Sequence, residues 1–430
     1  SVALIDEGGI GGTCLQRGCI PTKALLASAD VYYKAKNGED FGVLTEGVTF
    51  HMQKAIERKR KVVTELVSGI EKVLKRRKVE VIRGRGHLTD KNTVVVTDRE
   101  EPVQAEKIII ATGSKPVEIP AFEVDGEVVL TSDHALDLET LPKSMLIVGG
   151  GVIGCEFATF YSLVGVEVTV VEALDRLLLA SDKVLAKQAT AGLKKRGVTV
   201  KTKTRIEKLS AQDGRAVAVL ENGETIEAEK ALISIGRKSC TECIGLEEVG
   251  IEAERGQIKV DEKMRTNVEN IFAIGDATGG WWLAHVASTQ GIVAAEVAAG
   301  HEVKFESEVI PAVTFVKPEL AQVGLTEQQC KEKGLNFRTG RFMLGANGKA
   351  LAQGEGQGTV KLLVEEETGK LLGCHILGPH ASDLIAEVAV AMRNGVTAEG
   401  ICETIHAHPT LAEVIHEAAE AALGKPLHQI

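Results

Sequence analysis

The sequence predicts an α/β protein with two units built on parallel sheets and a separate α+β domain at its C-terminal end. Residues 141–172 show the pattern of a strand, a glycine-rich turn, a helix and a second strand. The apolar strand Ser1–Asp6 ends on a carboxylate, as does the strand Val168–Glu172. This repeated pattern predicts a second unit of the same kind. After Pro311 strand patterns come first and helices follow, the order of a separate α+β domain.

The remaining elements are predicted from hydrophobic periodicity. Expected helices cover Ala24–Lys36, His51–Lys75, Val152–Val164, a segment from the Trp281 region to about Ala299, Ala381–Asn394, Ala398–Cys402 and Leu411–Leu423. Expected strands cover Lys107–Thr112, Met145–Val148, Thr199–Thr202, Ala216–Leu220, Ala231–Ile235, Ile271–Ile274, Thr314–Val316, Thr359–Val364 and Leu371–Leu377, with hairpin strands at Val79–Val96.

Composition limits the class of protein. The chain has 430 residues, 44% of them hydrophobic, which is enough for two to four domains. A net charge of −10 without a basic patch argues against nucleic-acid binding. No apolar run reaches 18 residues, and no signal peptide is visible at Ser1. Eight cysteines fall short of a disulfide scaffold, so we expect a reducing, cytoplasmic compartment in which any disulfide is catalytic.

The turn Gly149-Gly150-Gly151-Val152-Ile153-Gly154 is a G-x-G-x-x-G between a strand and a helix. Its glycines let the backbone approach a pyrophosphate at the helix N-terminus. Glu172 ends the next strand, where a carboxylate accepts hydrogen bonds from ribose hydroxyls and repels a 2′-phosphate. This Rossmann-like unit is therefore predicted to bind NAD rather than NADP; the alternative is an ordinary turn in a parallel sheet.

Cys14 and Cys19 lie within Gly11-Gly12-Thr13-Cys14-Leu15-Gln16-Arg17-Gly18-Cys19-Ile20-Pro21-Thr22-Lys23. In an ideal α-helix this spacing corresponds to a rise of about 7.5 Å, beyond normal disulfide reach. A bond between the two cysteines needs a distorted backbone, which Gly18 permits, and a strained disulfide is easily reduced. The alternative is a pair of buried structural thiols.

His408 opens the stretch His408-Pro409-Thr410-Leu411-Ala412-Glu413, with Pro409 expected at the first position of the last long helix. Glu413, about one turn further on, could orient the His408 ring and offset the helix dipole. A histidine–carboxylate pair is suited to deprotonating a thiol. His406 and His416 lie nearby, and the residue types alone do not choose among the three histidines.

Two further patterns are weaker. Asp276 follows Gly275 at a strand end, before a helix, where its carboxylate suits a polyol chain or a ribose. Cys240 and Cys243 form a C-x-x-C, but a structural zinc site needs two more ligands and none is evident, so we expect a loop and no metal site.

Taken together, these residues resemble the pyridine nucleotide–disulfide oxidoreductases. GGTCLxxGCIPTK, KIIIATGS, GGGVIGCE, NIFAIGDA and HPTLAE occur in the order of that family, over essentially the whole chain. Within the family the CIPTK ending, AHPTLAEVIHEAA and Glu172 resemble the dihydrolipoamide dehydrogenases most.

The resemblance implies a role for each site residue. Cys14 is expected to exchange with the substrate and Cys19 to lie nearer the flavin, with Lys23 beside the flavin ring and paired with Glu156. His408 and Glu413 are expected to act on the disulfide of a partner subunit. The cofactors implied are FAD and NAD. The implied cofactor-binding residues are Asp6, Gly12, Thr13, Lys23, Thr112, Gly113, Gly149, Gly151, Gly154, Glu172, Gly236, Asp276 and Ala284.

The resemblance also implies how the chain is divided. Residues 1–141 correspond to an FAD-binding domain, 142–236 to an NAD-binding domain, 237–306 to a return to the central FAD region and 307–430 to a dimerisation domain. Because the family begins with a further strand, glycine turn and helix, we expect roughly 30 residues upstream of Ser1. Without them a chain of residues 1–430 is expected to bind FAD poorly and to be unstable.

The expected reaction is the oxidation of protein-bound dihydrolipoamide to lipoamide, with hydride transfer through FAD to NAD⁺. The expected partners are a second copy of the chain in a homodimer and a lipoyl-bearing protein of a 2-oxo acid dehydrogenase or glycine cleavage complex, with no nucleic acid or membrane. The alternatives are a related reductase such as glutathione reductase, which Glu172 disfavours, and a non-catalytic scaffold or partner subunit.

Overall fold

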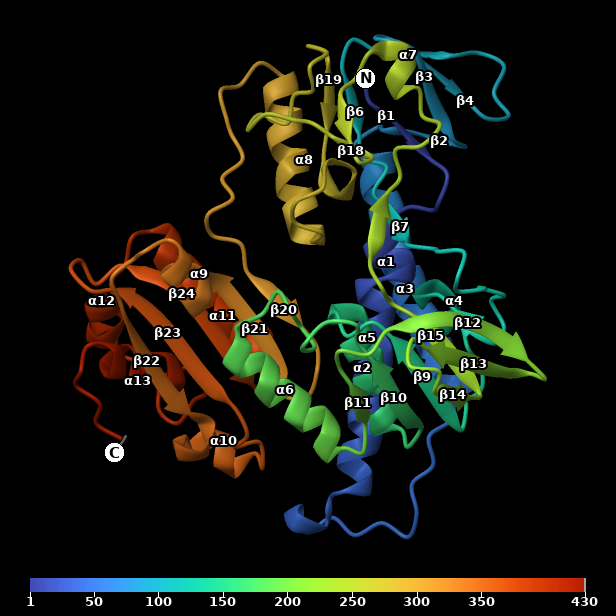
Figure 1. Ribbon diagram of the computed structural model, residues 1–430. Coiled ribbons are helices and arrows are strands. Elements are labelled where there is room, and N and C mark those ends of the chain that lie inside the picture. Colours follow the sequence, from blue (N-terminus) through green and yellow to red (C-terminus); the bar gives the residue numbers. More distant parts are fainter. Residues whose placement is uncertain (429–430) are drawn as a thin grey trace. The chain divides into compact units, whose positions relative to one another are not determined.

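The computed structural model describes residues 1–428, which divide into two compact units. Unit 1 contains residues 1–120, 130–141 and 235–306, and unit 2 contains residues 121–129, 142–234 and 307–428. Each unit is therefore assembled from segments that are distant in the sequence, as the colours in Figure 1 show. No helix in the described chain is both long and apolar enough to span a bilayer.

Unit 1 combines long helices with short parallel pairs of strands. Its elements are β1 (Ala3–Asp6), α1 (Gly12–Arg17), α2 (Cys19–Lys36), η1 (Glu39–Phe41), α3 (Met52–Arg76), β2 (Glu80–Arg83), β3 (Gly86–Asp90), β4 (Thr93–Val96), β5 (Val103–Gln104), β6 (Ile108–Ile110), β7 (Ser114–Pro116), α4 (Ser132–Ala135), β16 (Arg237–Ser239), α7 (Leu246–Val249), β17 (Ala253–Glu254), β18 (Gln257–Ile258), β19 (Ile271–Ala273), η2 (Gly275–Thr278) and α8 (Ala284–Ala298).

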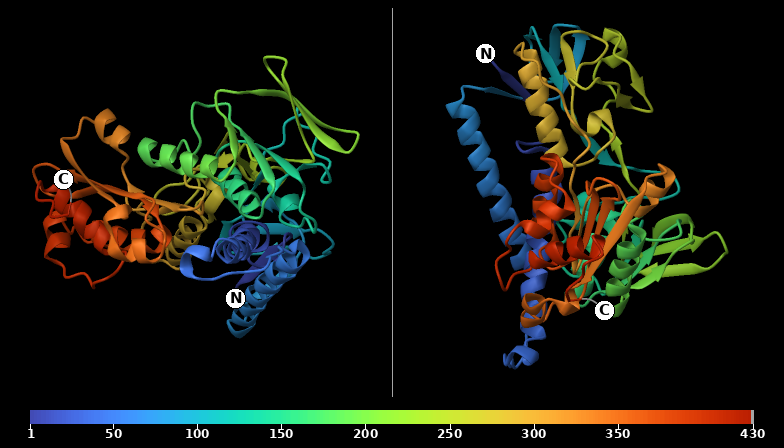
Figure 2. Two further views of the ribbon diagram at one scale, coloured as in Figure 1. Left: turned by 90° about the horizontal axis from the view of Figure 1, so that it is seen from below. Right: turned by 90° about the vertical axis from the view of Figure 1, so that its left-hand side faces the viewer.

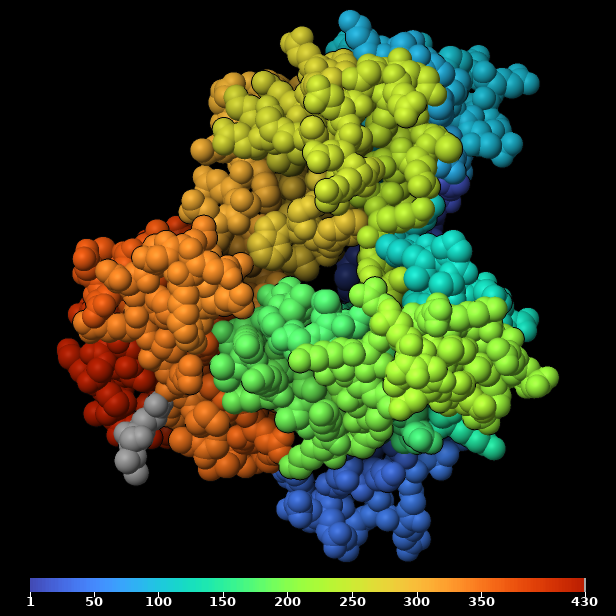
Figure 3. All heavy atoms as spheres, in the orientation of Figure 1, coloured from blue at the N-terminus to red at the C-terminus, as the bar shows by residue number. Residues whose placement is uncertain are grey.

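Two parallel pairs of strands, β1 with β2 and β6 with β19, carry the backbone framework of unit 1. They bring residues more than 70 positions apart into register, Ala3 opposite Glu80 and Ile108 opposite Ile271. Figure 2 shows α2 and α3 running side by side. In the face shown in Figure 3 the loop and short helix between them, residues 37–51 (blue), lie at the surface, where Leu44 is 80% exposed.

The prediction of hairpin strands over Val79–Val96 was wrong in its first part. β2 pairs in parallel with β1, and only β3 and β4 form the antiparallel hairpin. The chain changes direction at Gly84, which has φ 136° and donates its N–H to the Asp6 carbonyl over 3.1 Å. A side chain at this position would meet the Thr97 carbonyl at 2.8 Å, so the break requires glycine.

The first part of unit 2 is a parallel sheet covered by helices. The order of its strands is β11-β10-β9-β15-β8, and a separate antiparallel meander β12-β13-β14 follows. The elements are β8 (Val129–Leu130), β9 (Ser144–Val148), α5 (Val152–Leu163), β10 (Glu167–Val171), α6 (Lys183–Lys195), β11 (Thr199–Lys201), β12 (Ile206–Gln212), β13 (Arg215–Leu220), β14 (Thr225–Ala228) and β15 (Lys230–Ile233). The predicted βαβ pattern of residues 141–172 is confirmed, because β9 and β10 pair in parallel.

The last part of unit 2 is the α+β layer predicted after Pro311. An antiparallel sheet of order β20-β21-β24-β23-β22 shares one apolar core with α11 and α13 (Figure 1). The elements are β20 (Ala312–Thr314), β21 (Glu319–Gly324), α9 (Glu327–Glu332), β22 (Phe337–Met343), η3 (Leu344–Ala346), α10 (Gly348–Ala352), β23 (Thr359–Glu365), β24 (Leu371–Gly378), α11 (Ala381–Arg393), α12 (Ala398–Glu403) and α13 (Glu413–Ala422).

The predicted start of the last helix was wrong. α13 begins at Glu413, after the N-cap Ala412, and Pro409 lies before the helix in a cis peptide with His408. The first helical hydrogen bonds come from Val414 and Ile415, to the carbonyls of Leu411 and Ala412. The helix dipole, which acts within the first turn, is therefore complemented by Glu413 and lies further from His408 than expected.

Candidate active site

The two cysteines lie on either side of a break between two helices. α1 ends at Arg17 and α2 begins at Cys19, while Gly18 has φ −140° and ψ −111°. A side chain on Gly18 would meet the Thr13 carbonyl oxygen at 2.9 Å and Cys14 Cα at 3.3 Å, so glycine allows the two segments to approach. The predicted distortion is thus present, and it makes the Cys14 and Cys19 thiols hydrogen-bond partners.

The electrostatic environment of Cys14 favours its protonated form. The hydrogen bond with Cys19, burial of the thiol and negative charge on Cys19 together raise the pKa of Cys14 far above its ordinary value. The positive charge of Lys23 acts in the opposite direction. Lys23 is on α2, one turn after Cys19, so the cation and the thiol pair belong to the same local structure.

Asp276 belongs to a polar network at the carboxyl ends of β6 and β19. Its Oδ2 accepts a hydrogen bond from Ser114 Oγ over 2.5 Å, and Ser114 Oγ accepts one from Arg237 Nε over 2.8 Å. The preceding N–H, of Gly275, donates to the buried Gln290 Oε1 over 2.7 Å. Asp276 was predicted from the sequence, whereas Ser114, Arg237 and Gln290 were not; the serine that ends KIIIATGS was the visible signal.

The other predicted flavin-binding residues of unit 1 lie on loops and on element ends. Asp6 ends β1, and its Oδ2 accepts hydrogen bonds from Gly9 N over 3.0 Å and Arg83 Nη1 over 2.5 Å. Gly12 and Gly113 have φ of 62° and 69°, and nothing lies within 4 Å of a Cβ built on either. Backbone left open in this way fits the close approach of a phosphate or a ring. Thr13 is in α1, Thr112 precedes Gly113, and Ala284 begins α8.

The glycine turn in unit 2 has the geometry that nucleotide binding requires. A Cβ on Gly154 would lie 2.0 Å from the Gly149 carbonyl oxygen, so only glycine lets α5 pack this close to the turn. Gly151 caps α5 and has open space around it. These residues fit a dinucleotide pyrophosphate at a helix N-terminus.

The Glu172 carboxylate is fixed beside that turn by two backbone groups. Its Oε2 accepts a hydrogen bond from Gly150 N over 2.7 Å, and its Oε1 accepts one from Leu174 N over 2.8 Å. Because each carboxylate oxygen has a second acceptor position, the group can still bind two hydroxyls. The structure thus fixes the Glu172 carboxylate just after β10, beside the glycine turn.

Glu156 is a buried carboxylate on α5, only 4% exposed. Its Oε1 accepts a hydrogen bond from Phe315 N over 2.9 Å, which ties α5 to the segment after β20 within unit 2. The pairing of Glu156 with Lys23 stays a prediction.

His408 and Glu413 form the expected pair, with His408 Nδ1 2.8 Å from Glu413 Oε1. Although burial opposes the shift, hydrogen bonds from Thr410 N and His408 lower the pKa of Glu413. The His408 side chain is 79% exposed. His406 instead contacts Glu387 and the Thr404 carbonyl, and His416 contacts the Cys402 carbonyl. The structure therefore distinguishes the three histidines: His408 is the one that combines a carboxylate partner with an exposed ring.

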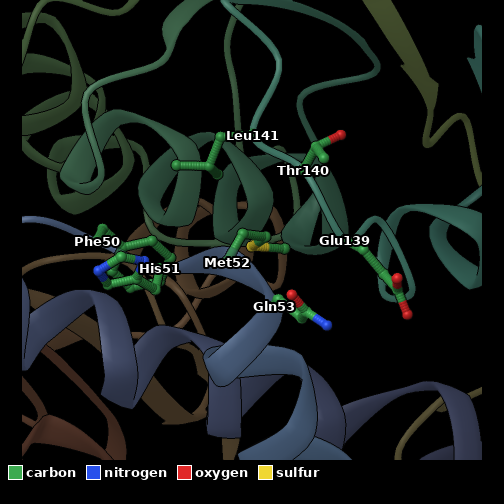
Figure 4. Close-up of a pocket in the computed structure, with 7 residues that line it drawn as sticks. All are labelled: Phe50, His51, Met52, Gln53, Glu139, Thr140 and Leu141. Carbon is green, nitrogen blue, oxygen red and sulfur yellow. The ribbon is translucent and has the colours of Figure 1, made fainter.

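A shallow pocket lies elsewhere in unit 1. It encloses about 290 Å³ between the start of α3 and the segment before Pro142. Figure 4 shows Met52 at the start of α3, with Leu141 and Glu139 on the segment that faces it. None of the predicted site residues lines it. Cys240 and Cys243 lie in a loop after β16, as expected, with Cys243 at φ 56°.

Comparison with known proteins gives consistent matches. Residues 1–291 match the family described as pyridine nucleotide-disulphide oxidoreductase, and residues 310–419 match its dimerisation domain. A dihydrolipoyl dehydrogenase from Geobacillus stearothermophilus is 44% identical, over 100% of this chain and 92% of its own length. One from Chlamydia pneumoniae is 42% identical, over 99% of this chain and 92% of its own.

Solved structures agree with this result. LpdA from Mycobacterium tuberculosis has a TM-score of 0.92 at 30% identity, over 98% of this chain and 93% of its own. The HOCl-induced flavoprotein disulfide reductase RclA from Escherichia coli has a TM-score of 0.88 at 28% identity, over 97% and 94%.

These matches bear out the predicted fold class, the cofactors FAD and NAD, and the homodimer. The family matches together span nearly the whole chain, and the motifs that carry the resemblance lie within the residues they cover. The chain belongs to the pyridine nucleotide-disulphide oxidoreductases.

Proposed function

We propose that the chain oxidises dihydrolipoamide to lipoamide and passes the electrons to NAD⁺. The observation that carries this proposal is the Cys14–Cys19 pair, held together at the Gly18 break with Lys23 one turn away. Two thiols within hydrogen-bond range can form a disulfide with a small movement. The relatives named dihydrolipoyl dehydrogenase support the choice of substrate.

The proposed chemistry is a pair of thiol–disulfide exchanges. A thiolate of the substrate attacks Cys14 Sγ of the Cys14–Cys19 disulfide, and Cys19 leaves as a thiolate. The second substrate sulfur then attacks the first and displaces Cys14. The substrate leaves as a disulfide, having lost two electrons and two protons, and Cys14 and Cys19 are left reduced. When bound, FAD carries the two electrons from the dithiol to NAD⁺.

His408 is proposed to accept the proton of the substrate thiol at Nε2, acting on the disulfide of the partner subunit. Glu413 holds Nδ1, which orients the ring and stabilises its protonated form. Because hydrogen bonds lower its pKa, Glu413 stays a carboxylate across the neutral range. Lys23 supplies positive charge that favours a thiolate in the reduced pair.

We assign the cofactors to the residues whose surroundings fit them. Asp6, Gly12, Thr13, Thr112, Gly113, Asp276 and Ala284 are proposed to hold FAD, together with Lys23. Gly149, Gly151, Gly154 and Glu172 are proposed to hold NAD, and Gly236, in unit 1 at φ 128° with open space around it, is proposed as a further cofactor-binding residue. The proposed division remains 1–141, 142–236, 237–306 and 307–430. The lipoyl group is proposed to belong to a 2-oxo acid dehydrogenase or glycine cleavage complex in the cytoplasm.

The test is a steady-state assay with dihydrolipoamide and either NAD⁺ or NADP⁺. We expect a higher kcat/KM for NAD⁺, and we expect Glu172→Ala to narrow the preference because it removes both the ribose contact and the repulsion of a 2′-phosphate. Glu167→Ala, at the exposed start of β10, is the matched control and should leave the preference unchanged. A wild type that favours NADP⁺, or that reduces glutathione disulfide faster than it oxidises dihydrolipoamide, would overturn the proposal.

A further inference from the structure

Three potential metal ligands gather on α13, a helix that the proposed reaction uses only at its first residue. His416, Glu417 and Glu420 each place one nitrogen or oxygen atom within 4.8 Å of those of the other two. His416 and Glu420 are four residues apart, so both project from the same face of the helix. The same i, i+4 spacing brings the two histidines of helical H-E-x-x-H zinc sites together.

Two carboxylate oxygens in this cluster lack a hydrogen-bond donor. Within residues 1–428, Oε2 of Glu417 and Oε2 of Glu420 are both buried and accept no hydrogen bond. His428 Nδ1 lies 2.7 Å from the other oxygen of Glu417, Oε1, and so offsets only part of the charge. Two neighbouring carboxylates with buried, unsatisfied oxygens are unfavourable, and a cation between them would satisfy both oxygens and offset their charge.

His416 is held as a ligating histidine usually is. Its Nε2 lies 3.1 Å from the carbonyl oxygen of Cys402, at the end of α12. A carbonyl only accepts, so Nε2 carries a proton and donates it, which leaves Nδ1 as the ring nitrogen that can coordinate a metal. A backbone carbonyl that orients the second ring nitrogen is the common outer contact of metal-bound histidines.

We propose that His416, Glu417 and Glu420 form a binding site for a divalent transition-metal cation, with zinc the best match. One imidazole and two carboxylates are ligands that zinc accepts, with water in the fourth position. Bonds of about 2.0–2.1 Å place tetrahedral ligands about 3.3–3.4 Å apart. Side-chain movements of about 1 Å therefore close the present 4.8 Å arrangement. The site is structural, because it links α13 to α12 through Cys402 and to the following segment through His428.

Zinc itself is the probe. The purified flavoprotein dimer is kept oxidised, since a reduced Cys14–Cys19 pair also binds zinc, and dialysed against micromolar ZnCl₂ before its metal content is measured. We expect about one zinc per chain. His416→Gln and Glu420→Gln should each weaken binding at least tenfold, whereas Glu403→Gln, an exposed carboxylate on α12, should not. The flavin spectrum of each variant reports whether it is folded.

X-ray absorption of the zinc-loaded wild type tests the ligands without any substitution. Nitrogen and oxygen scatterers alone support the site, and sulfur in the first shell overturns it. The proposal also fails if the wild type retains no zinc after dialysis, or if both substituted proteins bind it as tightly as the wild type. Neither result depends on whether the chain oxidises dihydrolipoamide.

Discussion

The hydrogen bond with Cys19 raises the pKa of the Cys14 thiol, and from this asymmetry we expect different tasks for the two cysteines. A high pKa makes Cys14 a poor thiolate at neutral pH, so the charge of the reduced pair is expected to reside on Cys19. Cys14→Ser should abolish dihydrolipoamide oxidation but keep an absorbance band between thiolate and flavin, and Cys19→Ser should lose the band. Identical spectra for the two variants would show that the roles are wrongly assigned.

His408 is expected to carry the proton, and the chain provides its own control. His406 lies close by and also has a carboxylate partner, Glu387, at 2.8 Å. His408→Gln should slow the half-reaction with dihydrolipoamide by roughly 10²–10⁴, the usual contribution of general acid–base catalysis. Electron exchange between NADH and the flavin should survive, and His406→Gln should affect the half-reaction far less. Stopped-flow reduction by each substrate measures both; equal losses in the two variants would contradict the assignment.

Single residues with a fixed spacing were predictable from the sequence, and their supporting partners were not. Cys14, Cys19, Glu172 and Glu413 could be proposed from the sequence because the chemistry expected of them depends on nearby residues along the chain. Ser114 and Arg237 contact each other across 123 positions, and no local pattern records that distance.

At the scale of elements, the close packing of α13 on the strand beneath it requires a glycine in that strand. A Cβ on Gly340 in β22 would lie 1.8 Å from the Ala418 carbonyl oxygen. Gly340→Ala therefore has to move α13 away from the sheet. Overpacking of this kind typically lowers the free energy of unfolding by about 1–3 kcal/mol. Because α13 carries Glu413, we also expect slower dihydrolipoamide oxidation.

The matched control is Gly348→Ala, at the start of α10, where an added Cβ meets nothing within 4 Å. Thermal unfolding and the steady-state rate should both distinguish the two substitutions. A Gly340→Ala protein as stable as the Gly348→Ala protein would mean that the sheet yields and that α13 is not fixed by this contact.

The elements that could not be predicted from the sequence have weak hydrophobic patterns or distant partners. α6 buries Leu185, Ala186, Ala189 and Leu193, so half of its buried face is alanine and its pattern is faint. β2 was read as part of a hairpin because local patterns favour pairing with the next strand. Its true partner, β1, lies more than 70 residues away.

At the scale of unit 2, a buried ion cluster joins the parallel-sheet part to the C-terminal layer. Lys361 on β23 is 1% exposed, and its Nζ lies 2.8 Å from Asp182 Oδ2, at the start of α6, and 2.5 Å from Glu327 Oε2. Lys361→Met leaves two carboxylates without this partner. Breaking a buried ion pair typically lowers the free energy of unfolding by about 3–5 kcal/mol. Lys331→Met removes an exposed partner of the same Glu327 and should cost about 0–1 kcal/mol.

The difference in the free energy of unfolding between wild type and Lys361→Met should depend on pH. Contacts with Lys331 and Lys361 lower the pKa of Glu327 to about 2, and Lys361 lowers that of Asp182 against the effect of burial. Both folded-state values lie below the unfolded ones, so the stabilisation is present above the ordinary carboxyl range and is lost as the pH falls toward 2. Urea unfolding of wild type and Lys361→Met from pH 7 downward measures this. A gap that persists at pH 2 would show that packing, rather than charge, is responsible.

The overall division of the chain was predictable only in part. After Pro311 strand patterns come first and helices follow, and residues 141–172 show a βαβ pattern. Each is a local pattern, and both appear in the structure. The return of residues 235–306 to the unit that contains residues 1–120 depends on strands β6 and β19 meeting. No local pattern records that contact, and a return of residues 237–306 was expected only from the family resemblance.

The narrow strand pairs of unit 1 have a consequence for ligand affinity. β1 and β2 form one two-stranded ribbon and β6 and β19 another, and β1 is partly exposed, whereas unit 2 holds two sheets of five strands. Ile5, next to Asp6, packs against the same apolar core as Ile110 of β6 and Ile271 of β19. A ligand bound by both Asp6 and Asp276 is therefore expected to stabilise both strand pairs together, because it binds the folded arrangement alone. Its measured affinity would then respond to a substitution at Ile5 as well as to the contacts that Asp6 makes.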